Sequence, residues 1–151
     1  MTVFDPSGDP NTARTRAMAG ELRVVVSKLV RRLREQAQTT DLTASQRSVL
    51  LHLEKVDSAT VTTLAKAESI RPQSMGATIS ALQAAGLVSG APHPSDGRQT
   101  VLSLTAKCRK MMKTSRAAKD DWLLHAIHTQ LTVKDQEKLA VAIALLKRLI
   151  D

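Results

Sequence analysis

The sequence contains few aromatic residues and a single cysteine. Its 151 residues include one tryptophan, one phenylalanine, no tyrosine and one cysteine. One cysteine excludes an intrachain disulfide, so the reducing interior of a cell is the simplest expected environment. Because aromatic rings are so scarce, Trp122 is the one obvious surface on which a small aromatic effector would stack.

Long apolar stretches are also missing. No run approaches the ~18 consecutive apolar residues of a membrane span, and the N-terminus lacks the basic and then apolar pattern of a signal peptide. We therefore expect a soluble cytoplasmic protein. The chain is long enough for one domain with a buried core, but it leaves no room for a second full catalytic domain.

The residue combinations of an enzyme active site are missing too. We find no nucleophile with a base, no paired carboxylates and no phosphate-binding glycine loop at a recognisable spacing. His125 and His128 lie one helical turn apart, but no cluster of Cys or Glu accompanies them as further metal ligands. The sequence therefore predicts a protein that is not an enzyme and that has no metal or other cofactor.

Positive charge is what the sequence has in excess. Lysine and arginine number 22 against 14 aspartates and glutamates, which gives a formal net charge of +8 and a pI near 10.2. A field of this size attracts polyanions before any specific contact forms, so nucleic acid or an acidic membrane surface is the expected partner.

Amphipathic helices are expected at both ends of the chain. Residues 1–11 have the composition of a flexible tail, and a long helix follows within residues 12–40. Two more helices are expected within residues 105–151, the second of them capped by Thr132. The apolar stripes of the terminal helices exceed what a monomer usually exposes, so these helices should hold a homodimer. The stripe residues are Met18, Leu22, Val25, Val26, Leu29 and Leu33, and then Leu139, Ile143, Leu146, Leu149 and Ile150.

The middle of the chain, residues 43–104, has the pattern of a helix-turn-helix. Thr43 and Gln46 form a capping box for a helix that should end near Val56. Two short helices follow, the first over residues 62–68 and the second beginning at Pro72, which suits a first helical position. A turn over residues 69–71 separates them, and this order is that of a helix-turn-helix.

The second short helix is expected to present an uncharged face to solvent. Its apolar residues Met75, Ile79 and Leu82 fall together on a helical wheel and should face the core. The opposite face is small and polar and carries no carboxylate, which suits a helix that lies in a DNA groove. The residues of this outer face are Gln73, Ser74, Ala77, Ser80 and Ala81.

A hairpin follows, with a strand from Leu87 and a returning strand over residues 101–104. Its turn, SDGR, needs the glycine and benefits from the aspartate, so Arg98 is surplus to the turn itself. A helix-turn-helix followed by such a hairpin is a winged helix. A membrane-surface protein would explain the charge but not this arrangement, so DNA is the favoured partner and no membrane is expected.

The segment SIRPQSMGATISALQAAGLVSGAPHPSDGRQTVLSLT resembles regulators of the MarR family. Those proteins carry a recognition helix, then GLV, then a wing with an Asp-x-Arg pair, then LT opening a long helix. The order of elements covers residues 12–151, and the more specific motif covers residues 70–105. Ser69 and Cys108 stand where the family often has glycine.

The resemblance implies a mainly α fold with a small antiparallel β-hairpin, that is, a winged helix-turn-helix with long N- and C-terminal dimerisation helices. It also implies a homodimer whose recognition helices lie ~34 Å apart on an inverted-repeat operator in double-stranded DNA. Such a dimer would repress transcription until a small ligand or an oxidant changes its geometry. The alternative is a non-specific architectural DNA-binding protein, which would lack the ~10³-fold preference expected of a regulator.

The candidate DNA contacts lie in and around the recognition helix and in the wing. Gln73 can pair with adenine, whereas Arg71 precedes the helix and should contact phosphate. Arg98 should enter the minor groove, and Asp96 should orient it. The candidates are Arg71, Gln73, Ser74, Ala77 and Thr78 in the recognition helix, Asp96, Arg98 and Gln99 in the wing, and Arg47 and Lys66 as weaker phosphate contacts.

Three further residues have two interpretations each. Cys108 begins a helix among cations, which would lower its thiol pKa and favour a reactive thiolate for redox sensing, or it is a small buried residue. Trp122 is a core or dimer-interface anchor, or it lines an effector pocket. Gly76 inside the recognition helix permits close approach, either to DNA or to the preceding helix.

Overall fold

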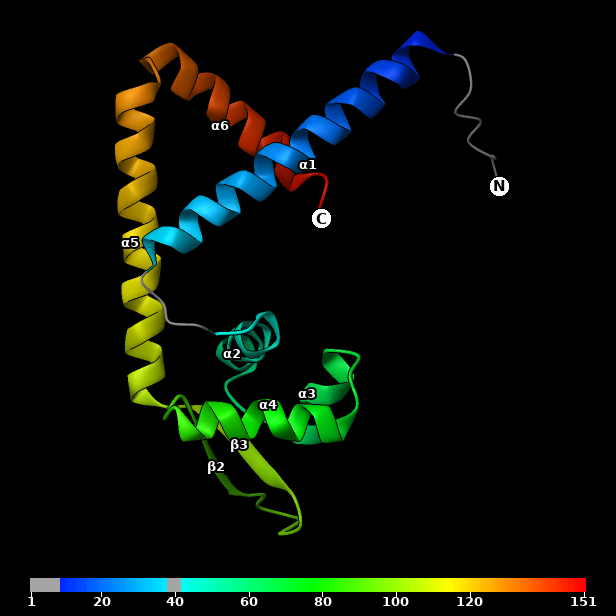
Figure 1. The fold of residues 1–151 in the computed structure, drawn as a ribbon, viewed down its shortest axis with the longest axis vertical. Helices are drawn as coiled ribbons and strands as arrows, with labels where there is room; N and C mark the ends of the chain where they lie inside the picture. The colour runs from blue at the N-terminus through cyan, green and yellow to red at the C-terminus, as the bar shows by residue number, and fades with distance from the viewer. Residues whose placement is uncertain (1–8, 38–41) are drawn as a thin grey trace. The chain divides into compact units, whose positions relative to one another are not determined.

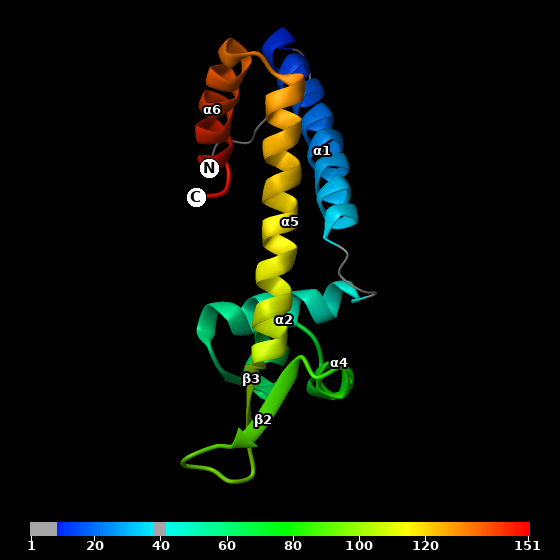
Figure 2. The ribbon, with the colours of Figure 1, turned by 90° about the vertical axis from the view of Figure 1, so that its left-hand side faces the viewer.

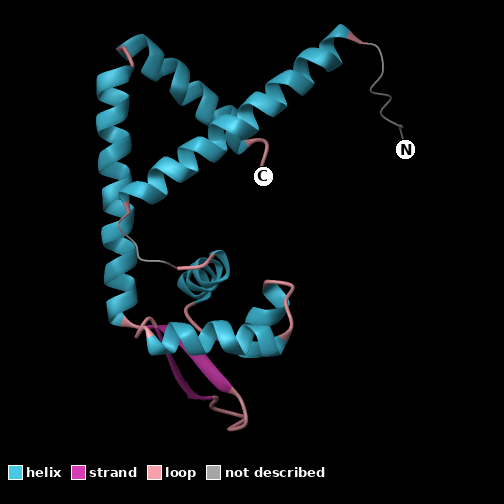
Figure 3. Ribbon diagram, viewed as in Figure 1, coloured by secondary structure: helices cyan, strands magenta, loops and turns pink. Residues whose placement is uncertain are grey.

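The computed structural model describes residues 9–37 and 42–151. The chain divides into two compact units, one formed by Met1–Gln38 with Ala118–Asp151 and the other by Thr39–Ala117. Among the described residues, strands occur only in the second unit, and helix makes up most of the rest (Figures 1 and 3). The expected mainly α fold with a small antiparallel sheet is confirmed.

The unit over residues 39–117 contains the winged helix. The capping box at the start of its first helix is confirmed, because the Thr43 N–H donates to Gln46 Oε1 at 2.9 Å and the Gln46 N–H donates to Thr43 Oγ1 at 3.2 Å. This helix ends at Val56, as expected. The elements in order are α2 (Ala44–Val56), β1 (Ala59–Thr60), α3 (Val61–Ala67), α4 (Pro72–Ala84), β2 (Val88–Pro92), β3 (Thr100–Leu104) and the first half of α5 (Ala106–Gln130).

The sheet has three strands rather than the two of the expected hairpin. Its order is β1-β3-β2, and both pairings are antiparallel. The additional strand, β1, is only two residues long and pairs Ala59 with Leu102 and Thr60 with Val101. Two residues give no alternating pattern that a sequence would reveal. The strand nevertheless attaches the wing to the start of α3.

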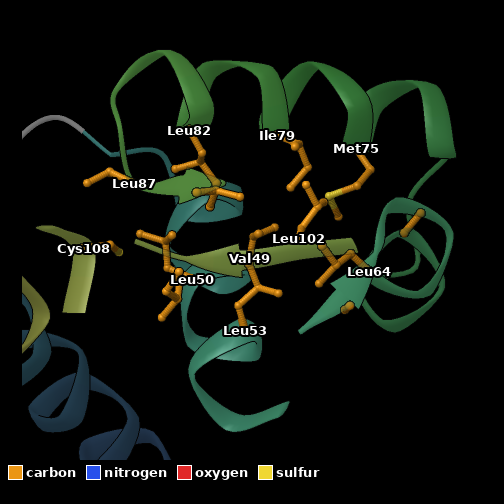
Figure 4. Close-up of a cluster of buried hydrophobic side chains, with 14 residues drawn as sticks. Val49, Leu50, Leu53, Leu64, Met75, Ile79, Leu82, Leu87, Leu102 and Cys108 are labelled. Atoms are coloured by element: carbon orange, nitrogen blue, oxygen red, sulfur yellow. The ribbon is translucent and has the colours of Figure 1, made fainter. Parts of the chain in front are cut away.

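The core of this unit brings together all three helices of the winged helix and the sheet. Figure 4 shows Met75, Ile79 and Leu82 pointing from α4 toward Val49 of α2 and Leu102 of β3. All five of these side chains are buried. The inward face expected for the recognition helix is therefore confirmed, and burying it fixes which side of α4 faces solvent.

The turn between α3 and α4 depends on a residue with positive φ. Ser69 has φ 54°, a conformation that glycine adopts more easily than any residue with a Cβ. Its N–H donates to the Lys66 carbonyl at 3.2 Å, and the Ile70 N–H donates to the Ala65 carbonyl at 3.0 Å. These bonds end α3 and let Arg71 serve as the N-cap of α4.

The other unit consists of α1 (Pro10–Gln36), the second half of α5 and α6 (Val133–Lys147). Helix α1 begins earlier than expected, because Asp9 caps it by accepting from the Asn11 N–H and Pro10 occupies a first helical position. The sequence indicated a start near Asn11 or Thr12, and the helix begins one or two residues before that. Residues 1–8 of the expected tail, and residues 38–40 of the expected helical region, lie outside the described part of the chain.

Helix α6 starts after Thr132, as expected, with a capping box. The Asp135 N–H donates to Thr132 Oγ1 at 3.2 Å, and the Thr132 hydroxyl donates to Asp135 Oδ2 at 2.6 Å. The bonds from Thr132 hold the pKa of the Asp135 carboxyl below its usual value. Among residues 9–37 and 42–151, none of the helices has the length and hydropathy of a membrane span.

The terminal helices leave their apolar side chains exposed. No residue of α1 or α6 is buried, and Figure 2 shows the two helices on different sides of α5. Most of their large apolar side chains are exposed in the single chain. The large apolar side chains exposed on the two helices are Met18, Val24, Val25, Val26, Leu29, Val30, Val133, Val141, Ile143, Leu145 and Leu146, followed by Leu149 and Ile150 at the end of the chain.

Candidate nucleic-acid interface

Helix α4 presents to solvent the residues that the sequence assigned to its outer face. Gln73, Ser74 and Ala77 are exposed, and Thr78 is half-buried at the edge of this face. Arg71 is the N-cap, but its side chain makes no capping hydrogen bond. Its guanidinium is exposed just before the first turn of α4, where it is available to a phosphate.

The tip of the wing is organised by two side chains that accept main-chain hydrogen bonds. Asp96 Oδ1 accepts from the Arg98 N–H at 3.1 Å. His93 Nδ1 accepts from the N–H groups of Ser95 and Asp96 at 3.1 and 3.2 Å. Asp96 thus holds the main chain of Arg98, and no ion pair between the two side chains is found in the described residues. Sequence reasoning missed His93, because an imidazole that acts as a turn acceptor has no spacing signature.

Gln99 closes the same turn from its other side. The His93 N–H donates to the Gln99 carbonyl, and the Gln99 N–H donates to the Asp96 carbonyl, both at 3.0 Å. The Gln99 side-chain amide lies 3.5 Å from Asp96 Oδ2. These contacts leave the Arg98 side chain exposed at the tip, so the wing presents a cation on a turn whose shape is fixed by hydrogen bonds.

Arg47 and Lys66, the two weaker phosphate candidates, differ in their surroundings. Lys66 is exposed in the last turn of α3. Arg47 is half-buried in α2, and its Nη1 donates to the Leu42 carbonyl within the same unit. Of the two, Lys66 has the more accessible charge. Beside Arg47, the Ser48 hydroxyl donates to Glu68 Oε2 at 2.5 Å and ties α2 to the end of α3.

The C-terminal end of α4 is held by the start of α5. The Thr105 hydroxyl donates to the Gly86 carbonyl at 2.7 Å, and the Thr105 N–H donates to the Leu87 carbonyl at 3.1 Å. Lys107 Nζ donates to the Ala85 carbonyl at 3.0 Å. Sequence reasoning assigned no such contact to Lys107. Its contact joins residues 22 positions apart and has no local signal.

Cys108 is fully buried in the core of the same unit. Burial raises the pKa of its thiol and Glu54 adds to the increase, although Arg109 acts in the opposite direction. The expectation of a lowered pKa is therefore wrong, because loss of solvent outweighs the nearby cation. The structure supports the other interpretation, a small buried residue.

Part of the positive charge of α5 is neutralised within the unit. Arg116 Nη2 lies 3.0 and 3.1 Å from the two carboxylate oxygens of Glu54, and Arg109 lies 3.8 Å from Asp57. These arginines are therefore engaged with carboxylates of the same unit.

Trp122, also on α5, is half-buried in the other unit.

Comparison with known proteins gives consistent matches along the chain. Residues 40–99 match a family model described as the MarR family. An HTH-type transcriptional regulator of Mycobacterium tuberculosis is 34% identical over 134 residues, which are 89% of this chain and 93% of the relative. An uncharacterized HTH-type transcriptional regulator of Mycobacterium leprae matches to the same extent, also at 34% identity.

Solved structures are similar over most of their length. A putative transcriptional regulator from Pseudomonas aeruginosa PA01 has a TM-score of 0.80 and 33% identity, over 91% of this chain and 96% of that one. A mutant MepR from S. aureus, bound to an oligodeoxyribonucleotide, has a TM-score of 0.71 and 15% identity, over 89% of this chain and 98% of that one. At that identity the second likeness shows a shared fold.

Proposed function

The chain belongs to the MarR family of transcriptional regulators, and on that premise we propose that it is a repressor which binds an inverted-repeat operator as a homodimer. Relatives of the same fold include the MepR mutant bound to an oligodeoxyribonucleotide and a MarR mutant from E. coli complexed with operator DNA. In this proposal α4 enters the major groove, and the wing reaches the adjacent minor groove.

The charge distribution around α4 is the main support for this proposal. The exposed face of α4 has no carboxylate, and exposed cations stand around it in the same unit, with Arg71 before the helix, Lys66 on α3 and Arg98 on the wing. No ion pair found in the described residues includes any of these three cations. A helix that can approach base edges, flanked by charges that can meet phosphates, suits duplex DNA.

The homodimer is supported by the terminal helices. Most large apolar side chains along α1 and α6 are exposed within the part of the chain that the structure describes, and a second copy offers the same stripes in a two-fold arrangement. In this organisation the two ends of the chain form the dimerisation helices, and the segment between them forms the DNA-binding lobe. Two lobes related by a two-fold axis require an inverted repeat.

Release from DNA is proposed to depend on a small molecule rather than on oxidation of Cys108. A thiol that is buried and has a raised pKa is a poor target for peroxide. Trp122 is partly exposed and offers an aromatic surface for an effector. We propose no metal or organic cofactor.

Selection of bound sequences from a pool of random duplex DNA tests the proposal. A repressor of this kind should recover a palindrome and should prefer it by at least ~10³-fold over random duplex. An architectural DNA-binding protein would bind the pool with little preference and would return no motif. Recovery of no palindrome would therefore overturn the proposed function in favour of that alternative.

A further inference from the structure

Helix α4 contains no ionisable side chain in its 13 residues. The nearby cations lie outside it, at Arg71, Lys66 and Arg98. Proteins most often distinguish guanine in the major groove by donating two hydrogen bonds from arginine or lysine to its O6 and N7 atoms. Residues 72–84 cannot make this contact, so the helix must distinguish base pairs by other chemistry.

Few hydrogen-bonding groups on α4 remain available to a base edge. The Thr78 hydroxyl donates to the Ser74 carbonyl at 3.3 Å, which engages its proton within the helix. Gln83 Nε2 lies against the wing, 3.3 Å from where a Cβ on Gly90 would stand. The exposed polar side chains left are Gln73, Ser74 and Ser80. Of these, only Gln73 can form a two-bond pair with a base, and adenine is the base that matches it.

The rest of the exposed face of α4 carries small residues, which allow the helix to approach DNA closely. Ala77 and Ala81 present only methyl groups. Gly76 weakens the helix relative to alanine, although a Cβ at this position would meet no protein atom within 4 Å. The expectation that Gly76 makes room for the preceding helix is therefore wrong. The open space at Gly76 favours the other explanation, close approach of DNA.

We propose, on the basis of the proposed DNA binding, that α4 reads A·T base pairs. The methyl group of Ala77 contacts the C5-methyl group of thymine, and the side-chain amide of Gln73 forms hydrogen bonds with adenine. Arg71 and Lys66 contribute phosphate contacts that carry no sequence information. The half-site positions read by Gln73 and Ala77 are then A·T pairs, and no guanine is specified by a two-bond contact from this helix.

The first test uses the duplex recovered by selection from random DNA. Each thymine is replaced in turn by deoxyuridine, which removes the C5-methyl group and leaves the base pairing unchanged. At the thymines under α4 we expect the dissociation constant to rise about fourfold, the equivalent of roughly 0.8 kcal/mol for one buried methyl group. Replacement of thymines elsewhere should leave the dissociation constant unchanged.

The second test assigns the methyl contact to Ala77. In the Ala77→Gly protein, one of the sensitive thymines should lose its sensitivity, so that the thymine and deoxyuridine duplexes bind equally. Because both duplexes are compared on the same protein, any loss of helix stability cancels. Ala117→Gly is the matched control, an exposed alanine inside α5, and it should keep the full fourfold difference.

The outcomes separate this inference from the proposed function. A palindrome whose thymines are all insensitive to deoxyuridine, or whose half-site positions under α4 are G·C pairs, would overturn the reading assigned to α4 while leaving the repressor proposal intact. Retention of every sensitive thymine by Ala77→Gly would overturn the assignment to Ala77. Failure to recover any palindrome would count against the proposed function itself.

Discussion

At the scale of single residues, the wing shows how an acidic side chain can serve a DNA-binding surface. Asp96 Oδ1 accepts from the main-chain N–H of Arg98 and stands beside His93, which accepts two further N–H groups of the turn. The carboxylate therefore shapes the chain that carries the arginine. In the proposed complex with DNA, this geometric effect would favour binding, whereas the negative charge of Asp96 would repel the phosphates.

This geometry predicts the sign of a substitution. Arg98→Ala should weaken operator binding by about 1–3 kcal/mol and reduce discrimination at flanking A·T positions, because a minor-groove contact is lost. Asp96→Ala should produce a weaker version of the same effect, since the turn loses the acceptor for the Arg98 N–H. Titration of the selected duplex measures both.

Asp120→Ala is the control for charge alone, because it removes one exposed carboxylate from α5. It should leave the affinity almost unchanged. Tighter binding by Asp96→Ala would show that electrostatic repulsion dominates, and the orienting role of Asp96 would then be wrong.

Cys108 leads to a prediction about pH. Burial raises the pKa of its thiol, so the unfolded chain releases the proton at a lower pH than the folded chain does. The stabilising contribution is complete below the unfolded pKa of about 8.5 and is lost as pH rises through the folded value. Between about pH 8 and 10 the free energy of unfolding should fall more steeply in the wild type than in Cys108→Ala, as measured by urea denaturation.

The sequence contains no tyrosine that would titrate near this pH range, and the lysines are the same in both proteins. A difference between the two pH profiles therefore reports the Cys108 thiol. Parallel pH profiles for the two proteins would mean that the thiol is not desolvated in the folded state.

At the scale of elements, the contact between the wing and α4 requires a glycine in β2. A Cβ on Gly90 would lie 2.7 Å from Thr100 Cγ2 and 3.3 Å from Gln83 Nε2. Gly90→Ala should therefore lower the free energy of unfolding by about 1–3 kcal/mol, because the Thr100 side chain must leave its position and that of Gln83 must adjust. Urea denaturation measures the loss.

Thr100→Ser removes the methyl group that Gly90→Ala would meet, so the double variant should recover most of the lost stability. A Gly90→Ala protein that is as stable as the wild type would contradict the close packing, and so would a double variant without recovery.

Two other glycines lie in open space and should respond in the opposite way. A Cβ at Gly76 in α4 or at Gly20 in α1 would meet nothing within 4 Å. Alanine at either position should raise the free energy of unfolding by about 0.5–1 kcal/mol. Gly76→Ala should also weaken operator binding, whereas Gly20→Ala should not, provided that sedimentation shows it to be still dimeric. Equal operator affinities for the two variants would argue that DNA does not approach Gly76.

The elements that the sequence predicts well are those with local signals. Thr43 with Gln46, Thr132 before α6, and Pro72 at the start of α4 each mark a boundary within a few residues of chain. The missed features depend on distant residues. Strand β1 exists because β3 pairs with it, and Lys107 holds an end of α4 that is far away in sequence.

The candidate DNA-binding surface follows the same distinction. Periodicity identified the exposed side of α4 correctly, because burial of Met75 and its neighbours leaves one choice of outer face. For Cys108 the sequence left two interpretations open, and its burial with a raised thiol pKa supports the small buried residue over the reactive thiolate. Periodicity therefore predicted which side of α4 faces solvent, whereas the state of the Cys108 thiol depends on packing between distant residues.

At the scale of the whole molecule, the proposed dimer depends on apolar surface that lies near the chain terminus. Removal of residues 138–151 should give a monomer or an aggregate in sedimentation, because it deletes most of the exposed stripe of α6. The double substitution Leu149→Glu with Ile150→Glu keeps the helix and should also give monomers, since these side chains are 71% and 85% exposed in the single chain. A soluble DNA-binding dimer after the truncation would contradict this arrangement.

Because α4 carries no charge, the overall affinity of the protein for DNA and its preference among DNA sequences depend on different contacts. Attraction to phosphates depends on counterion release, so it weakens as the ionic strength of the surroundings rises. Methyl contacts and amide pairs to bases release no counterions. In the proposed complex, a shift in cellular salt would therefore change the fraction of time for which the operator is occupied, while the preference for one base pair over another under α4 stays the same.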